Sequence, residues 1–400
     1  MKQKSRFPYL WVGTLMMLLL GSIYAWSYFK TALGAIFPMW NQKQLSLTFT
    51  IMMILFAAGG LLGGKLSKTI RHSTLALLSG CLMLIGFVTV SFLPSGNKTL
   101  ALILLYIFYG GFTGLGVGIG YNVVLSCVNS WFPDKDGLVS GILLTGFGFS
   151  SLIIANAAES LLRITTLSIV FRGLGILCGG VMVLGSFFLR LPTAVDTLPA
   201  PKKKAVVSGG QDYTTAQMLR RPTFWLYFLW NLCMSATGML VINNAASIAL
   251  FFGAAATIGL LVSIFNSGGR LFIGMSMDKF GWKATMLIDN AVIISAGLLM
   301  VLGNALGLFP LVMIGMLMAG VCYGGGVTIQ ASLVRTFYGS KNYAVNFSTC
   351  NLVMIPAAFI GPMISAALVD AAGGAFGPTF IMVIVMGFFS LVINFFIRKP

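Results

Sequence analysis

A single arginine, Arg270, interrupts a long apolar run in the stretch SIFNSGGRLFIGMSMDKFG at residues 263–281. A charge at the centre of a lipid-spanning helix costs about 2.5–3.5 kcal/mol on insertion scales, so such residues usually serve a function. The guanidinium group stays charged and offers a planar fork of N–H donors that matches a carboxylate. We therefore expect Arg270 to hold an anion, with pairing to backbone carbonyl groups as the structural alternative.

Four more polar side chains are candidates for the same site. Asn266 lies four residues before Arg270, hence on the same helical face, and its amide can donate to a second oxygen atom. Tyr24, Tyr121 and Tyr323 stand in apolar runs, and each offers a phenolic hydroxyl group on an aromatic wall. Packing inside the membrane is the alternative for each tyrosine.

Carboxylates that could neutralise Arg270 are scarce. The chain has eight acidic residues, and we expect all but Asp289 in loops or at the ends of spans. Asp289 could pair with Arg270, but we expect it near the inner membrane interface. With no deep carboxylate in the protein, an anionic ligand would supply the missing counter-charge.

The composition assigns the chain to the integral membrane proteins. Of its 400 residues 58% are hydrophobic and 8% are charged, whereas an ordinary soluble domain has about 25% charged residues. Unbroken apolar runs of about 20 residues predict spanning helices rather than the alternating segments of a β-barrel. We predict an all-α protein with twelve spans, at residues 9–29, 45–66, 74–93, 99–122, 136–160, 167–190, 223–248, 254–276, 283–303, 308–332, 343–367 and 375–397. The first is expected to stay in the protein rather than to be a cleaved signal peptide.

The distribution of lysine and arginine predicts that both termini are cytoplasmic. With this orientation nineteen cations lie in inner segments, and five lie in outer segments: Lys30, Lys43, Lys98, Arg163 and Arg172. The net charge of +17 then reflects topology and contact with anionic lipid, not nucleic acid. The location expected is a cell membrane, specifically the bacterial cytoplasmic membrane.

Residues 191–222 break the rhythm of the spans with prolines, a lysine triplet and a Ser-Gly-Gly run. Such a composition predicts a cytoplasmic linker. It would join an N-terminal six-helix domain at residues 1–190 to a C-terminal six-helix domain at residues 223–400. The two domains look like distant copies of one another.

Related loops follow the second span of each half. GMSMDKFGWK at residues 274–283 carries Gly274, Asp278, Lys279, Gly281 and Lys283, while GLLGGKLSKT at 60–69 keeps Gly60, Lys65 and Lys68 but has Gly64 in place of the acid. Asp278 can cap a neighbouring helix N-terminus, and Lys279 and Lys65 can pair across an inner gate. We expect these three residues to act in gating.

Spans four and ten share glycines spaced four residues apart, at Gly110, Gly114 and Gly118 and at Gly320 and Gly324. Glycine at this spacing forms a smooth stripe that lets two helices approach closely. We predict close packing along both stripes, which is also compatible with helices that slide.

The loop pattern, the twelve spans and the central linker resemble the major facilitator superfamily. That resemblance implies two six-helix domains that rock about a central cavity, with substrate bound near the bilayer midplane. A closer resemblance rests on GSIYAWSYF (21–29), GIGYNVVLSCVNSWFPDKDGLVSGILLTGFG (118–148), FNSGGRLFIGMSMDKFG (265–281) and NYAVNFSTC (342–350). These segments look like the oxalate/formate antiporter family, which is close to the monocarboxylate transporters.

The closer resemblance implies exchange or symport of small organic acids, with Arg270 as the carboxylate ligand and Tyr24, Tyr121 and Tyr323 around it. Oxalate exchangers of this family carry a second cation, a lysine in span eleven, and alignment on Asn342 and Tyr343 places Cys350 there. One intramembrane cation suits a singly charged acid. We therefore predict a monocarboxylate rather than oxalate.

No nucleophile–base pair, metal cluster or phosphate loop is recognisable, so an enzyme is not expected, nor is a cofactor. The six cysteines form no CxxC pair, and neither a disulfide nor a metal site is predicted. The expected partners are a small organic anion, a counter-anion or proton, and membrane lipid, and we expect a monomer. The alternatives are a carrier of drugs or sugars and a non-transporting sensor on the same scaffold.

Overall fold

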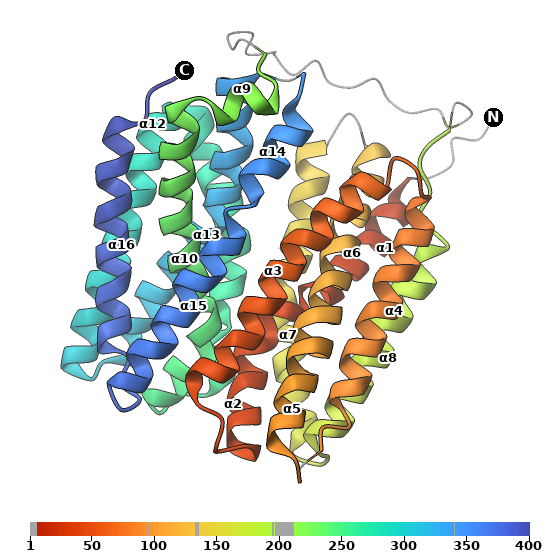
Figure 1. Ribbon diagram of the computed structural model, residues 1–400, viewed down its shortest axis with the longest axis vertical. Helices are drawn as coiled ribbons and strands as arrows, with labels where there is room; N and C mark the ends of the chain where they lie inside the picture. The colour runs from red at the N-terminus through yellow and green to blue at the C-terminus, as the bar shows by residue number, and fades with distance from the viewer. Residues whose placement is uncertain (1–5, 95, 133–135, 194–195, 197–211, 340) are drawn as a thin grey trace. The chain divides into compact units, whose positions relative to one another are not determined.

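The computed structural model describes residues 6–94, 96–132, 136–193, 196, 212–339 and 341–400, without the side chains of residues 136, 137, 278, 343 and 344. The described residues form helices and connecting turns, with no strand among them. Twelve helical segments are long and apolar enough to cross a membrane. The predicted all-α fold with twelve spans is therefore confirmed (Figure 1).

The first half of the chain contains spans one to six. Its helices are α1 (Phe7–Leu20), η1 (Gly21–Ala25), α2 (Trp26–Ile36), α3 (Gln42–Leu66), α4 (His72–Val90), α5 (Lys98–Leu104), η2 (Leu105–Thr113), α6 (Gly114–Ser130), α7 (Asp136–Leu162) and α8 (Leu167–Ser186). Span one is a continuous helical run through α1, η1 and α2, and span four runs through α5, η2 and α6.

The second half contains spans seven to twelve. Its helices are α9 (Thr215–Leu219), α10 (Pro222–Phe251), α11 (Ala256–Gly259), α12 (Leu261–Leu306), α13 (Phe309–Tyr338), α14 (Tyr343–Asn351), α15 (Met354–Ala371) and α16 (Gly377–Phe396). Spans eight and nine both belong to α12, which turns sharply at Gly281 (φ 74°, ψ 173°). Only glycine adopts this backbone conformation at low cost.

The chain divides into two compact units by its contacts. Unit 1 comprises residues 1–38 and 47–204, and unit 2 comprises residues 39–46 and 205–400. Most of the linker predicted at residues 191–222 lies outside the described residues. The segment 39–46 joins unit 2, where the Asn243 amide donates to the Ser46 hydroxyl group (3.0 Å).

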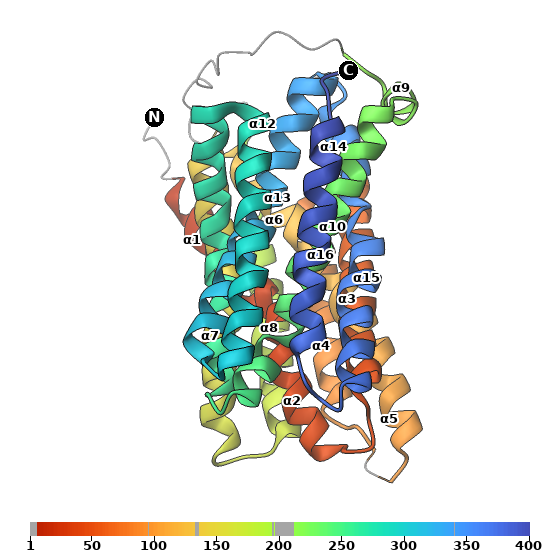
Figure 2. The ribbon, with the colours of Figure 1, turned by 90° about the vertical axis from the view of Figure 1, so that its left-hand side faces the viewer.

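Within each unit the glycine stripes bring a pair of spans into direct backbone contact. In unit 1, a Cβ added at Gly114 would lie 2.6 Å from the Met52 carbonyl oxygen of α3. In unit 2, a Cβ at Gly320 of α13 would lie 2.7 Å from the Val262 carbonyl oxygen of α12. The predicted close packing along the glycine stripes is confirmed: span four packs on α3, and span ten packs on α12. Helices α12 and α13 lie side by side in Figure 2.

The end of span one differs from the prediction. The sequence run was expected to end at residue 29 with Lys30 in an outer segment, but the helix continues to Ile36 and Lys30 is only 1% exposed. Lysine at the edge of an apolar run usually marks an interface. Here it is followed by a further turn and a half of helix that packs in unit 1, so the lysine is buried.

Candidate functional site

Arg270 lies in the part of α12 that precedes the turn at Gly281, and its side chain is partly buried. Its Nε and Nη1 atoms are buried, and no described residue accepts a hydrogen bond from either. The Thr328 hydroxyl of α13 donates to the Arg270 backbone carbonyl (3.2 Å), which ties this part of α12 to its neighbour. Arg270 forms no ion pair with any acid whose side chain is described. Two N–H groups of the guanidinium fork are therefore available to a ligand.

Asn266 is one helical turn before Arg270 and 1% exposed. Neither its Nδ2 nor its Oδ1 atom has a hydrogen-bond partner among the described residues. A buried amide without partners costs about 1–3 kcal/mol per unsatisfied group. The backbone at this position is held tightly, because a side chain at Gly324 of α13 would overlap the Asn266 carbonyl oxygen. Asn266 and Arg270 thus present unpaired polar atoms from one stretch of α12.

Tyr323 of α13 is buried, with 6% of its surface exposed. It packs on Gly238 of α10, where a Cβ atom would overlap the tyrosine ring. Tyr323 is next to Gly324, whose backbone meets Asn266. Unit 2 therefore places Arg270 and Asn266 where α12 meets α13, whereas the Tyr323 ring of α13 packs on α10.

The remaining two predicted site residues meet in unit 1. Tyr24 of η1 and Tyr121 of α6 both contact the ring of Phe147 of α7, at 5.4 Å and 5.2 Å between centroids. Phe56 of α3 joins the cluster, 5.5 Å from Tyr121. Edge-on rings at these separations are favourable. The structure therefore groups both tyrosines in one aromatic cluster built by four spans.

Lys30 was missed as a candidate by the sequence analysis. It is among the largest fully buried side chains of the described residues, and its burial overturns the expectation of a single cation within the spans. Lysine is rarely buried completely unless it is paired or functional. Unit 1 thus has a fully buried cation, Lys30, and unit 2 has the partly buried Arg270.

Asp289 is completely buried in α12, about 12 Å beyond Gly281 at 1.5 Å per residue. It forms no ion pair with Arg270, and neither carboxyl oxygen has a partner with hydrogen-bonding geometry among the described residues. Its complete burial between helices was not expected from the sequence, whereas its depth in the membrane stays a prediction.

The amide groups of unit 2 form a network that the sequence did not indicate. The Asn231 side chain of α10 donates to Gln330 of α13 (2.8 Å), and Gln330 donates to Asn351 of α14 (2.7 Å). Ser235 donates to Asn231 (3.2 Å). These groups lie on three helices far apart in sequence, so only the fold brings them together. Because they satisfy one another, they tie the helices together.

Of the predicted gating residues, Lys65 belongs to unit 1, and Asp278 and Lys279 belong to unit 2. Lys65 at the end of α3 and Lys279 of α12 are exposed, and the Lys279 amine lies 5.1 Å from the centroid of the Phe280 ring. The side chain of Asp278 lies outside the described residues. The role of these three residues in gating remains a proposal.

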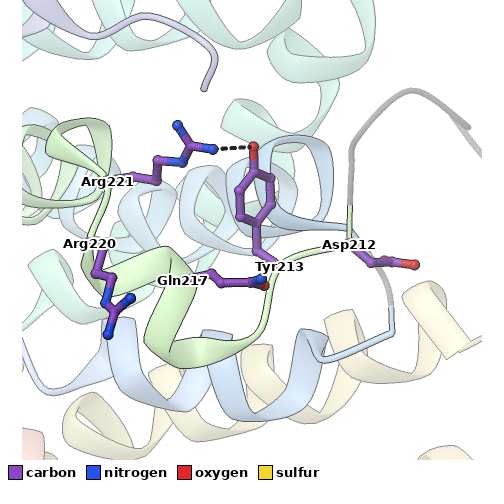
Figure 3. A pocket seen from close by; sticks show the side chains of 5 residues that line it. All are labelled: Asp212, Tyr213, Gln217, Arg220 and Arg221. Atoms are coloured by element: carbon purple, nitrogen blue, oxygen red, sulfur yellow. Dashed lines mark hydrogen bonds between the residues drawn. The ribbon is translucent and has the colours of Figure 1, made fainter.

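A surface hollow of about 300 Å³ lies where the linker rejoins unit 2. It is lined by Asp212, Tyr213, Gln217, Arg220 and Arg221 (Figure 3). The Arg221 guanidinium donates to the Tyr213 hydroxyl group (3.4 Å) and lies 5.2 Å from the centroid of its ring. Backbone bonds fix this segment, since the Tyr213 amide donates to the Tyr338 carbonyl of α13 (3.1 Å).

Nothing in the described residues suggests a metal centre: no three His, Cys, Asp or Glu side chains there are grouped to hold one. The six cysteines are free thiols, and five of them are buried. Asp289 is the one acidic residue among the buried polar side chains of the described residues, which otherwise carry amide, hydroxyl, imidazole and amine groups.

Comparison with known proteins shows which proteins this chain is similar to. The MFS-type transporter YhjX of Escherichia coli (strain K12) is 29% identical over 346 residues, which cover 83% of this chain and 81% of that protein. The oxalate:formate antiporter of Oxalobacter formigenes is 27% identical over 381 residues, covering 92% and 86%. The crystal structure of a D-xylose-proton symporter superposes with a TM-score of 0.72 at 16% identity, covering 99% of each chain, which shows the fold alone.

The family model of the Major Facilitator Superfamily matches residues 10–355. With twelve apolar spans, the protein is a multi-pass transporter of the membrane. The predicted resemblance, including its relation to the oxalate/formate antiporter, is confirmed. The chain belongs to the Major Facilitator Superfamily.

Proposed function

We propose that this transporter carries small organic anions, monocarboxylates in particular, by alternating access as an antiporter or a proton-linked carrier. The observation that supports this proposal most is the state of Arg270, whose Nε and Nη1 atoms are buried and have no acceptor among the described residues. A cation in this setting is costly, and a bound carboxylate would offset that cost by accepting both N–H groups.

The hydrogen-bond donors of Arg270 and Asn266 indicate the size and charge of the substrate. A carboxylate fits the fork of a guanidinium in a bidentate manner, and the Asn266 amide, one turn away, can donate to a further oxygen. We propose Tyr323 as a neighbour of this group, and Tyr24 and Tyr121 as the residues that unit 1 contributes. One carboxylate group therefore suffices to complete the donors of unit 2.

The similarity to the oxalate:formate antiporter of Oxalobacter formigenes supports the same class, because oxalate and formate are both carboxylates. Our preference for a monocarboxylate rests on the two unpaired N–H groups of Arg270. Lys30 weakens the argument from charge alone, since a second buried cation would also suit a dianion. Oxalate therefore belongs in the test.

The test is uptake of labelled formate, lactate, pyruvate and oxalate into proteoliposomes that contain the purified protein. We expect uptake of at least one monocarboxylate, and its loss in Arg270→Ala. Stimulation by acid inside the vesicles would indicate exchange, and dependence on a pH gradient would indicate symport. Arg172→Ala is the matched control, because Arg172 lies within α8 and is held over the ring of Phe92 (4.5 Å).

Three outcomes contradict the proposal. Uptake that survives Arg270→Ala removes Arg270 from the site, and tight binding of oxalate without transport of any monocarboxylate overturns the preferred substrate. Uptake of sugars or cationic drugs instead would favour the other carrier classes. Binding of an acid without any transport would indicate a sensor.

A further inference from the structure

Asp289 differs from its neighbour in the sequence, Asn290, in its hydrogen bonds. Its neighbour in sequence, Asn290, is equally buried but well bonded: it accepts from the Trp230 indole of α10 (3.0 Å) and from Asn394 of α16 (3.3 Å). Asp289 receives no such bond at either carboxyl oxygen from the described residues. The two adjacent positions of α12 therefore have opposite polar environments.

An ionised carboxylate cannot persist in such a place. Removing an unpaired charge from water costs far more than protonating it, so a buried carboxyl group without donors takes up a proton. Two titratable groups interact with Asp289: the Cys322 thiol of α13, which donates to the Asp289 backbone carbonyl (3.6 Å) and also interacts with its side chain, and Tyr227 of α10. From α16, Ser390 and Asn394 bond to the neighbouring Asn290, and neither titrates. No described cation interacts with Asp289.

Two tyrosine hydroxyl groups of unit 2 are, like the Asp289 carboxyl group, without a hydrogen-bond partner among the described residues. Tyr227 is buried, and its hydroxyl group has no hydrogen-bond partner among the described residues. Tyr227 interacts electrostatically with Tyr338 at the end of α13, whose hydroxyl group is also buried and unpartnered. The Tyr338 ring contacts the Tyr213 ring edge-on at 5.7 Å between centroids.

Tyr213 lines the hollow at the end of the linker, with its hydroxyl group pointing to Arg221 (Figure 3). Asp289, Tyr227, Tyr338 and Tyr213 all belong to one compact unit.

We propose that Asp289 is a proton-binding site that couples transport to the proton gradient. In each cycle the carboxyl group takes up one proton and becomes neutral, and it releases that proton when another state of the transporter hydrates it. This inference deepens the proposed function and rests on it, because coupling requires a transported anion. It selects proton linkage over simple exchange.

The first experiment needs no substrate. Infrared spectra of the purified protein, recorded at neutral pH, should show the carbonyl band of a protonated carboxylic acid. We expect this band in the wild type and in the control Asp370→Asn, which changes an exposed acid at the end of α15, and its loss in Asp289→Asn. A band that is unchanged in Asp289→Asn would overturn the proton site.

The second experiment tests coupling with labelled formate in proteoliposomes. We expect Asp289→Asn to keep formate–formate exchange and to lose uptake driven by an imposed pH gradient, down to the level of protein-free vesicles. Asp289→Glu should recover part of it. Equal loss of both modes in Asp289→Asn would indicate a structural role and refute the coupling. A wild type that moves no formate would instead count against the proposed function, while the infrared result still decides the proton site.

Discussion

At the scale of single residues, the buried polar atoms carry most of the functional information. Arg270 and Asn266 lack partners on one turn of α12, and Asp289 lacks partners on the next span. Natural proteins satisfy nearly all buried polar groups, so an unsatisfied one needs an explanation. Here a ligand for the first pair and a proton for the carboxyl group provide it.

Lys30 leads to a prediction about substrate charge. If it contributes to the site, Lys30→Gln should impair a dianion more than a monoanion, because the neutral amide removes one of two cations. We expect oxalate uptake or binding to fall by about tenfold or more, equivalent to about 1.4 kcal/mol, while formate uptake changes less. Competition of each acid against labelled formate measures the ratio.

Lys98→Gln, at the exposed first residue of α5, is the control for loss of a positive charge. Equal effects of Lys30→Gln on both acids would mean that Lys30 supports the fold of unit 1 and does not read the charge of the substrate.

The sequence could reveal Arg270 because a charge in an apolar run is visible without any structure. It could not reveal the state of Asp289 or Lys30, since both stand near predicted ends of spans, where charged residues are usually hydrated. Their burial depends on which neighbouring helices cover them. The Asn231–Gln330–Asn351 network was hidden for the same reason, because its members come from three helices.

At the scale of helices, the contact between α12 and α13 positions the proposed ligand residues. A methyl group at Gly324 would overlap the backbone at Asn266. We expect Gly324→Ala to lower the free energy of unfolding by about 1–3 kcal/mol, as overpacking does, and to reduce formate uptake. Thermal unfolding in detergent measures the first effect.

Gly180→Ala of α8 is the matched control, because a Cβ there would meet no atom within 4 Å. Alanine exceeds glycine in helix propensity by about 1 kcal/mol, so this variant should be equally or more stable. If both variants melted at the wild-type temperature, the close approach at Gly324 would have no energetic weight.

The start of the linker has a contact that depends on pH. Arg190, just after α8, donates twice to Asp196 (2.8 and 3.0 Å), and the Thr193 amide donates to the same carboxyl group (2.8 Å). These donors hold the pKa of Asp196 well below its usual range. The pKa of Asp196 is therefore lower in the folded than in the unfolded protein. Its ionised carboxylate stabilises the folded state above the unfolded pKa of about 3.9, and this stabilisation is lost as the pH falls from there through the folded pKa.

We therefore expect Asp196→Asn to melt slightly below the wild type near neutral pH, with the difference closing below about pH 4. The effect is small and falls with added salt, because the pair is solvated. Melting temperatures measured across pH and salt test this. A difference that persisted unchanged at low pH would show that the carboxylate charge is not its cause.

At the scale of the whole chain, the twelve spans were predictable because each is a long apolar run bounded by polar turns. The end of span one was not predictable, because Ser27 and Lys30 are polar residues of the kind that usually mark the end of a span. The family followed from short motifs, and comparison confirmed it over residues 10–355. The substrate class, the coupling ion and the orientation of the termini stay proposals that the transport experiments decide.

The linker is fastened at both of its ends. Near its start the Arg190 carbonyl accepts from the Trp131 indole of unit 1 (2.7 Å), and at its end Tyr213 is bonded to Tyr338, Asn342 and Asn346 of unit 2. The chain between Asp196 and Asp212 can stretch to about 55 Å at most, at ~3.5 Å per residue. The length of this segment sets an upper limit on the distance between Asp196 and Asp212 during a transport cycle. Any deletion that shortens it below the separation required would arrest the carrier in whichever state keeps the anchors nearest.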